Sequence, residues 1–192
     1  AIGGLQSAGI QEMLHDNPGI KPFQPGKAAM AGVLAADLAK LGARGPQSLY
    51  EGMHGWLNAM CAGEYSKEAL IGELGTRWEI MYTYTKLYPT CRHSHAAIDL
   101  AREAKETLKC SIDEIKDIDI NTYSLGFTEV GQIICPTSFE EAMFSMPFSV
   151  ALALVRGNVR LADYSAETLT NKKLQNLARK VSIKIDESMN DN

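Results

Sequence analysis

The sequence has 192 residues, of which 45% are apolar and 22% are charged, and its net charge is −4. This composition is typical of an ordinary globular protein and suffices for one large domain or two small ones. The lack of long charge runs argues against broad electrostatic binding to nucleic acid. No apolar run approaches the ~18 residues that a membrane-spanning helix needs.

The cysteines and the start of the chain bear on its compartment. The opening AIGGLQSAGIQEML lacks the charged and apolar regions of a secretory signal, so we expect a cytoplasmic protein. This opening has the pattern of a helix already in progress, and we expect a piece of a longer polypeptide that lacks an N-terminal part. Reduced thiols fit the widely spaced cysteines better than a disulfide framework does: Cys61, Cys91, Cys110 and Cys135.

Residues 1–75 have a helical pattern. The run KAAMAGVLAADLAKLG carries apolar side chains at helical spacing, and Gly42 stands where a C-cap glycine belongs. The many alanines in this run predict a buried helix that a neighbouring backbone approaches closely. The methionines of this region are interpreted as core side chains: Met30, Met53 and Met60.

The pattern changes near residue 76. The stretch WEIMYTYTKLY (78–88) is rich in aromatic and β-branched residues and predicts a strand. An amphipathic helix follows, with Ser94 placed to cap it. A strand is then expected near 115–124, and a loop over 126–137.

The last third of the chain is predicted to alternate helices with a final strand. A long apolar helix over 138–157 contains Pro147, which should kink the helix or mark its true start. Another helix begins at a Ser165 cap, and VSIKID forms a closing strand. Few strands among many helices predict an α+β domain over 76–192, after a helical part over 1–75.

Two segments share one layout. KPFQPGKAAMAG and KLYPTCRHSHAA each have a lysine, an aromatic residue, a proline and then the start of a helix. A helix start offers unpaired N–H groups and partial positive charge, so Lys21 and Lys86 beside such starts predict two anion cradles. If the cradles converge, they suit a ligand with several carboxylates. The alternative is that both lysines are solvated surface side chains.

The second of these segments is dense in reactive side chains. Cys91, His93 and His95 alternate, which on a strand would allow zinc binding, but a helix start at Ser94 breaks the alternation. Asp99 follows His95 at helical spacing and could orient it, or the two could simply anchor the helix. The Cys91 thiol could be reactive, or it could be buried and unreactive. No nucleotide-binding motif is present.

Several stretches resemble the MmgE/PrpD family, which includes 2-methylcitrate dehydratase, cis-aconitate decarboxylase and iminodisuccinate epimerase. The matching stretches span nearly the whole chain: GGLQSAGIQEML, KPFQPGKAAMAGVLAADLAKLG, KLYPTCRHSHAAIDLA, IKDIDINTY and EAMFSMPFSVALALVRG. The resemblance implies a large helical domain with a smaller α+β domain, and a homodimer. It also implies chemistry without a cofactor or metal, which handles a proton on a carbon next to a carboxylate.

The resemblance assigns roles to particular residues. Lys21 and Lys86 match pocket lysines that pair with substrate carboxylates, and we take Lys86 also as catalytic. Cys91 stands where the decarboxylase has a histidine and is a candidate catalytic residue, while His93 lies at the rim as a substrate-binding candidate. Phe127 falls near a pocket tyrosine of the decarboxylase, and a phenylalanine has no proton to donate.

These assignments favour a dehydratase of the 2-methylcitrate kind, because Cys91 and Phe127 both depart from the decarboxylase pattern. A decarboxylase, an epimerase and a non-catalytic anion-binding or assembly fragment remain alternatives. Other catalytic residues of the family belong to its N-terminal half, so the 192 residues alone are expected to be inactive and to self-associate through exposed apolar helix faces. No nucleic-acid or membrane partner is expected.

Overall fold

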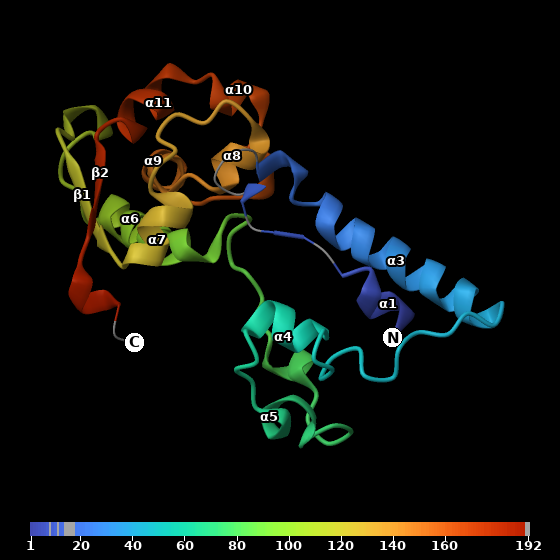
Figure 1. Cartoon of the computed structure of the whole chain (residues 1–192). Coiled ribbons are helices and arrows are strands. Elements are labelled where there is room, and N and C mark those ends of the chain that lie inside the picture. The colour runs from blue at the N-terminus through green and yellow to red at the C-terminus, as the bar shows by residue number, and fades with distance from the viewer. Residues whose placement is uncertain (8, 11, 14–17, 191–192) are drawn as a thin grey trace. The chain divides into compact units, whose positions relative to one another are not determined.

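The computed structural model describes residues 1–7, 9–10, 12–13 and 18–190 (Figure 1). Internal contacts divide the chain into two units. The helical unit comprises the described residues of 1–11 and 20–84, and the α+β unit comprises those of 12–19 and 85–192. These units are groups of mutual contacts, and the domain boundary expected after residue 75 stays a prediction.

The helical unit is built from short helices and one long one. Its elements are α1 (Ile2–Leu5), α3 (Phe23–Lys40), α4 (Trp56–Cys61), α5 (Lys67–Ile71) and the 3-10 turn η2 (Glu79–Tyr82), while the turn η1 (Pro18–Ile20) joins the two units in sequence. Helix α1 packs on α3, where Gly3 faces Ala35. Gly42 follows α3 with a φ of +93°, so the predicted glycine stop is confirmed.

The prediction that helix α3 is buried is wrong. Ala31 is its one buried residue. Met30 and Val33 keep 63% and 65% of their surface exposed, and the core interpretation fails likewise for Met53 and Met60. The apolar side chains of α3 are spread around the helix rather than gathered on one face. Within this unit, α1 is the helix with extensive contacts to α3, and four residues cover little of an eighteen-residue helix.

The strand predicted over 78–88 is also wrong. Residues 79–82 form the 3-10 turn η2, and no part of the stretch pairs with a strand among the described residues. Trp78, Ile80 and Met81 are exposed. A preference for strand structure depends on cross-strand neighbours and burial. Residues 78–87 are exposed, and Tyr88 is buried without a strand partner among the described residues.

The α+β unit contains a parallel two-stranded sheet. Strands β1 (Ile118–Thr122) and β2 (Val181–Ile185) pair in the register Ile118↔Val181 to Thr122↔Ile185. The chain between them forms most of the helices, as a parallel connection requires. Those helices are α7 (Ser124–Val130), α8 (Phe139–Met143), α9 (Met146–Arg156), α10 (Ala166–Leu169) and α11 (Lys172–Ala178). The α+β class and both strands in this unit are confirmed.

Helix α9 forms the centre of the core. Its residues from Met146 to Leu154 are all buried. Helices α6 (His95–Thr107) and α11 pack against it (Figure 1). Pro147 stands in the first turn of α9, where a missing N–H costs nothing, so it marks the true start as predicted. The side chain of Ser145 caps this turn by accepting a hydrogen bond from the Phe148 N–H at 3.1 Å.

Three local predictions in this unit have different outcomes. Ser165 caps its helix by accepting from the Thr168 N–H at 3.2 Å, as expected. Ser94 does not cap α6, because the 3-10 turn η3 (Arg92–Ser94) precedes that helix and leaves the Ser94 hydroxyl buried without a partner. The loop expected over 126–137 begins as helix α7, in which Gly126 is buried against Thr122.

Among the described residues, no helix is both long and apolar enough to cross a membrane. The four cysteines are free.

Candidate functional site

The segment around Lys86 is anchored to the end of α8. The carbonyl of Met143 accepts hydrogen bonds from the Cys91 N–H at 2.9 Å and from the Thr90 hydroxyl at 2.5 Å. The Thr90 carbonyl in turn accepts from the Lys86 ammonium at 3.2 Å. Tyr88 between them is buried. This segment therefore presents an exposed lysine from a fixed backbone.

A cavity of about 360 Å³ lies beside Lys86. Two loops line it: residues 86–89, which precede η3, and residues 158–161, which follow α9. Lys86 and Arg160 are its charged members, and Asn158 adds a polar side chain. Two cations and an amide at one cavity can bind a ligand with more than one carboxylate.

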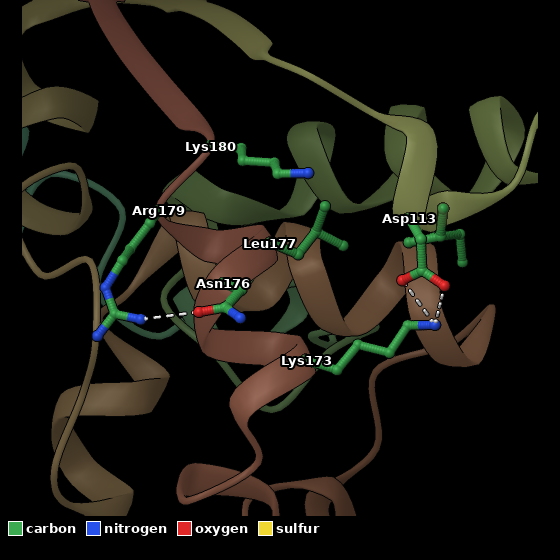
Figure 2. A pocket seen from close by; sticks show the side chains of 7 residues that line it. Asp113, Lys173, Asn176, Leu177, Arg179 and Lys180 are labelled. Atoms are coloured by element: carbon green, nitrogen blue, oxygen red, sulfur yellow. Dashed lines mark hydrogen bonds and ion pairs between the residues drawn. The ribbon is translucent and has the colours of Figure 1, made fainter.

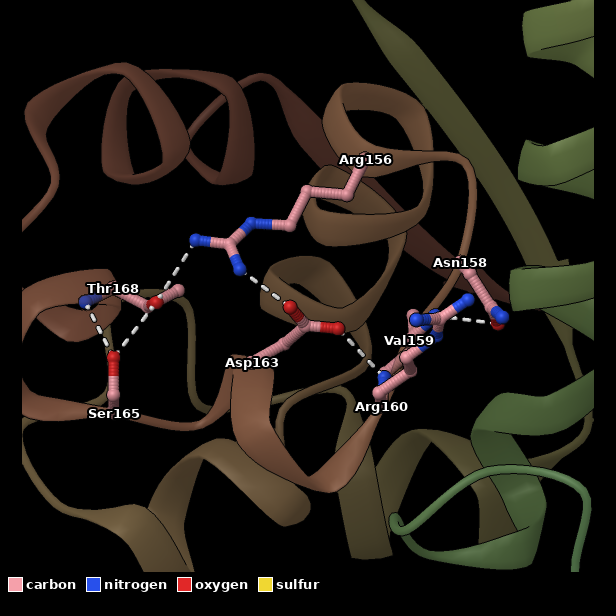
Figure 3. A network of polar contacts seen from close by, with 7 residues as sticks. All are labelled: Arg156, Asn158, Val159, Arg160, Asp163, Ser165 and Thr168. Atoms are coloured by element: carbon pink, nitrogen blue, oxygen red, sulfur yellow. Dashed lines mark hydrogen bonds and ion pairs between the residues drawn. The ribbon is translucent and has the colours of Figure 1, made fainter.

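A polar network holds the second loop in place (Figure 3). Asp163 is buried in the 3-10 turn η5 (Leu161–Asp163), accepts the Arg160 N–H at 2.7 Å and pairs with Arg156. The Arg156 guanidinium also donates to the Thr168 hydroxyl at 3.1 Å. Asp163 thus fixes the backbone at Arg160, a residue that lines the cavity.

His93 forms a second polar feature with a residue that the sequence analysis missed. Its Nδ1 is hydrogen-bonded to the Tyr123 hydroxyl, and the two rings meet edge to face with centroids 5.5 Å apart. Tyr123 lies directly after β1 and immediately before α7, a helix that contacts η3. The end of a predicted strand is a position where polar side chains often gather at a site, and that was the available signal.

The environment of His93 favours its neutral ring. Burial lowers the pKa of His93, and the positive charges of Lys86 and Arg92 lower it further, while Glu129 opposes them. Lys86 therefore lies within electrostatic reach of this ring. A neutral imidazole at pH 7 can accept a proton.

Phe127 lies on the same side of α7 as the hydrogen-bonded residues His93 and Tyr123. It follows Tyr123 by four residues, and its N–H bonds to the Tyr123 carbonyl at 3.0 Å. The side chain is half-buried. Cys91 is half-buried as well, directly before η3. The structure thus gathers Lys86, Cys91, His93 and Phe127 in the α+β unit, and their predicted roles stay predictions.

Asp99 does not orient His95. It accepts a hydrogen bond from Tyr88, and Arg102 donates to the Tyr88 hydroxyl at 2.7 Å and to the Gly157 carbonyl at 3.1 Å. His95 is 1% exposed, packs edge to face on Tyr88, and its Nε2 has no hydrogen-bond partner. Burial is the main cause that lowers the pKa of His95. Asp99 and His95 thus both contact Tyr88, by different means.

Lys21 belongs to the helical unit, and its surroundings differ from the expected cradle. The chain there is not extended, because α3 already begins at Phe23 with Pro22 as its N-cap. Pro25 has no N–H to offer in the first turn, and the Gln24 N–H bonds to the Lys21 carbonyl at 3.1 Å. This helix start therefore offers few donors to an anion. Convergence of Lys21 with Lys86 stays a prediction.

A larger cavity of about 690 Å³ along α11 is also cationic (Figure 2). Lys173 pairs there with Asp113 at 3.0 Å, Arg179 bonds to Asn176 at 3.2 Å, and Lys180 donates to the Ile115 carbonyl. Each cation thus has a protein partner. Arg179 and Lys180 follow the C-terminus of α11, where the helix dipole favours positive charge, and Lys173 in its first turn is neutralised by Asp113.

Metal ligands do not gather in the part of the chain that the structure describes. No three His, Cys, Asp or Glu side chains of these residues lie close enough to hold an ion. His93 is engaged by Tyr123, so the alternation with Cys91 and His95 does not produce a ligand set here.

Comparison with protein families gives two matches. Residues 88–192 match the MmgE/PrpD C-terminal domain, and residues 1–68 match the MmgE/PrpD N-terminal domain. Comparison with curated proteins gives no match.

Proposed function

We propose, because the chain belongs to the MmgE/PrpD family, that it is a portion of a cofactor-free lyase. The family includes dehydratases and related enzymes. The proposed reaction removes water from a small polycarboxylate of the 2-methylcitrate kind. One observation carries this proposal. Lys86 and Arg160 face the same cavity of about 360 Å³, in the unit that also holds the His93–Tyr123 pair. We propose a cytoplasmic homodimer as its working form.

Lys86 and Arg160 are the proposed carboxylate ligands. A carboxylate that bonds to Lys86 replaces the Thr90 carbonyl, which costs little because Lys86 is exposed. The Arg160 guanidinium can bind a second carboxylate through two parallel N–H groups. Charge neutralisation at the carboxylate next to the reacting carbon lowers the cost of removing a proton from that carbon.

His93 is the proposed proton acceptor of this site. For Nε2 to accept the proton, Nδ1 must carry the hydrogen and donate it to the Tyr123 oxygen. The electron pair of the broken C–H bond then forms the carbon–carbon double bond as the hydroxyl leaves with a proton as water. Cys91 lies close in sequence and is the proposed donor of that proton.

Proton NMR in D2O tests the reaction class. The full gene product is incubated with 2-methylcitrate, citrate, cis-aconitate and a simple dicarboxylate, in parallel with Lys86→Ala and the exposed-lysine control Lys172→Ala. Water loss in wild type and Lys172→Ala but not in Lys86→Ala is the expected result. Loss of CO2 or deuterium uptake alone would replace the dehydratase with a decarboxylase or an epimerase, and no turnover would overturn the proposal.

A further inference from the structure

A groove of about 350 Å³ runs along strand β1, and its lining residues differ from those of the cavity beside Lys86. Residues 117–121 all line it, together with apolar side chains of α6 and α9 such as Leu100, Ala104 and Leu154. The face of a strand contributes alternate residues only, so a lining of consecutive residues places the groove along an edge of the strand. Since β1 pairs with β2 on one side, this is its other edge.

Some backbone N–H and C=O groups of β1 point away from β2 at this edge. The Ile118 N–H bonds to the Lys180 carbonyl at 2.9 Å, and the Thr122 carbonyl accepts the Asp186 N–H at 2.9 Å. In a parallel pair, alternate residues turn both backbone groups to the same neighbour. Asp119 and Asn121 therefore turn their N–H and C=O groups toward the groove. A two-stranded sheet with such an edge is a template for a further strand.

The side chains around the groove indicate which strand would fit. Alanine and leucine side chains of α6 form an apolar wall, and Leu100 is 66% exposed. Asp117 and Asp119 place two carboxylates at the edge. Asp119 already pairs with Lys184 of β2 at 2.9 Å, so a lysine on a neighbouring strand reaches this face of the sheet.

We propose that this groove binds an extended segment of a partner protein in which apolar residues alternate with lysine or arginine, as an added strand beside β1. Main-chain hydrogen bonds to Asp119 and Asn121 supply affinity, and the apolar side chains of the segment fill the groove along α6. The basic side chains lie on the opposite face, near Asp117 and Asp119. A second copy of β1 fits less well, since most registers would bring these carboxylates together.

Fluorescence anisotropy with a labelled peptide of alternating valine and lysine tests this proposal on the full chain. Asn121→Pro removes an N–H that points into the groove and keeps the bonds between β1 and β2, so binding should weaken about tenfold or more. Ile185→Pro is the matched control at the far edge of β2 and should bind as wild type. If only Ile185→Pro weakens binding, or neither variant does, the proposal is wrong.

A charge variant tests the proposal even if the proline variant fails to fold. Asp117→Lys alters no backbone group and should weaken the lysine peptide and strengthen a valine–glutamate peptide, each about threefold to tenfold at low salt. Equal binding of both peptides to wild type would contradict the proposed partner chemistry. Dimerisation of the free chain that Asn121→Pro abolishes would identify a second copy as the occupant and overturn the proposal.

Discussion

In the proposed mechanism, Tyr123 acts through His93 rather than by touching substrate. Its hydroxyl is bonded to Nδ1, so the proposal leaves Nε2 to accept the substrate proton, with Nδ1 donating to the Tyr123 oxygen. Tyr123→Phe should lower kcat about tenfold and leave KM nearly unchanged, because the loss concerns the tautomer of the base and not carboxylate binding. The pH–rate profile should also shift, since the neighbour of the titrating ring changes.

The control for this variant is Tyr65→Phe, which removes the hydroxyl of an exposed tyrosine in the helical unit. Steady-state rates with the substrate identified by NMR give the comparison. An unchanged kcat in Tyr123→Phe would mean that the phenol only packs against His93.

His95 links stability to pH. Its pKa is lowered in the fold mainly by burial, so the unfolded chain binds a proton more readily. The folded state therefore keeps its full stability above the unfolded pKa of about 6.5 and loses it as the pH falls toward the folded value. His93 is shifted in the same direction and adds to this loss.

Urea unfolding at pH 7.5 and 5.5 measures the effect. For each such histidine the slope below pH 6.5 is at most about 1.4 kcal/mol per pH unit, the value for one proton taken up on unfolding. In His95→Gln the stability loss between the two pH values should be smaller than in wild type. An equal loss in both proteins would contradict the account of His95.

Apart from Phe127, which came from the family resemblance, the residues of the site could be predicted only where they share one stretch of sequence. Lys86, Cys91 and His93 stand within one quoted motif, and the structure places them in one region of the α+β unit. Arg160 and Tyr123 come from other segments, one after α9 and one after β1. Their proximity depends on tertiary packing, which hydrophobic periodicity does not reveal.

Helix α9 depends on its cap. The Ser145 hydroxyl accepts from the Phe148 N–H and donates to the Ile133 carbonyl, and the residue is fully buried. Ser145→Ala removes the cap and leaves a carbonyl without its partner, so unfolding free energy should fall by about 2–3 kcal/mol.

Ser138→Ala is the comparison at α8, where the Ser138 hydroxyl accepts from the Glu141 N–H at 3.1 Å near the surface. Its cost should be about 1 kcal/mol, because water can replace the lost bond. Chemical denaturation of both variants gives the difference. Equal costs would show that burial at Ser145 adds nothing to the cap.

Elements were predictable where a local signal agreed with the tertiary environment. The alternation of Ile118 and Ile120 marked β1, and Pro147 marked the start of α9. Stretch 78–88 has the composition of a strand, but no strand among the described residues pairs with it. Helix α7 was missed because Gly126 weakens the helical signal, although its missing Cβ is what allows close packing on Thr122.

At the scale of the whole molecule, the helical unit differs from the α+β unit in burial. The α+β unit has one continuous core centred on α9. In the helical unit, α3 leaves Met30, Val33 and Leu34 exposed. Exposed apolar surface of this kind favours association. This supports the expectation of self-association, which stays a prediction.

Sedimentation velocity over a range of concentrations tests that prediction. Met30→Lys on α3 should shift the chain toward monomer. Met189→Lys in the turn η6 (Glu187–Met189) is the control and should not, although that methionine is exposed too, at 43%. A chain that stays monomeric at all concentrations, or an equal shift in both variants, would contradict a role for the face of α3.

The most direct test of the central claim is calorimetric titration of the full gene product with citrate. Wild type and Lys172→Ala should bind with the same Kd, and Lys86→Ala and Arg160→Ala should each weaken binding by about tenfold to a hundredfold, since each loses a charged hydrogen bond. If neither variant changes the Kd, the cavity between residues 86–89 and 158–161 is not the carboxylate site.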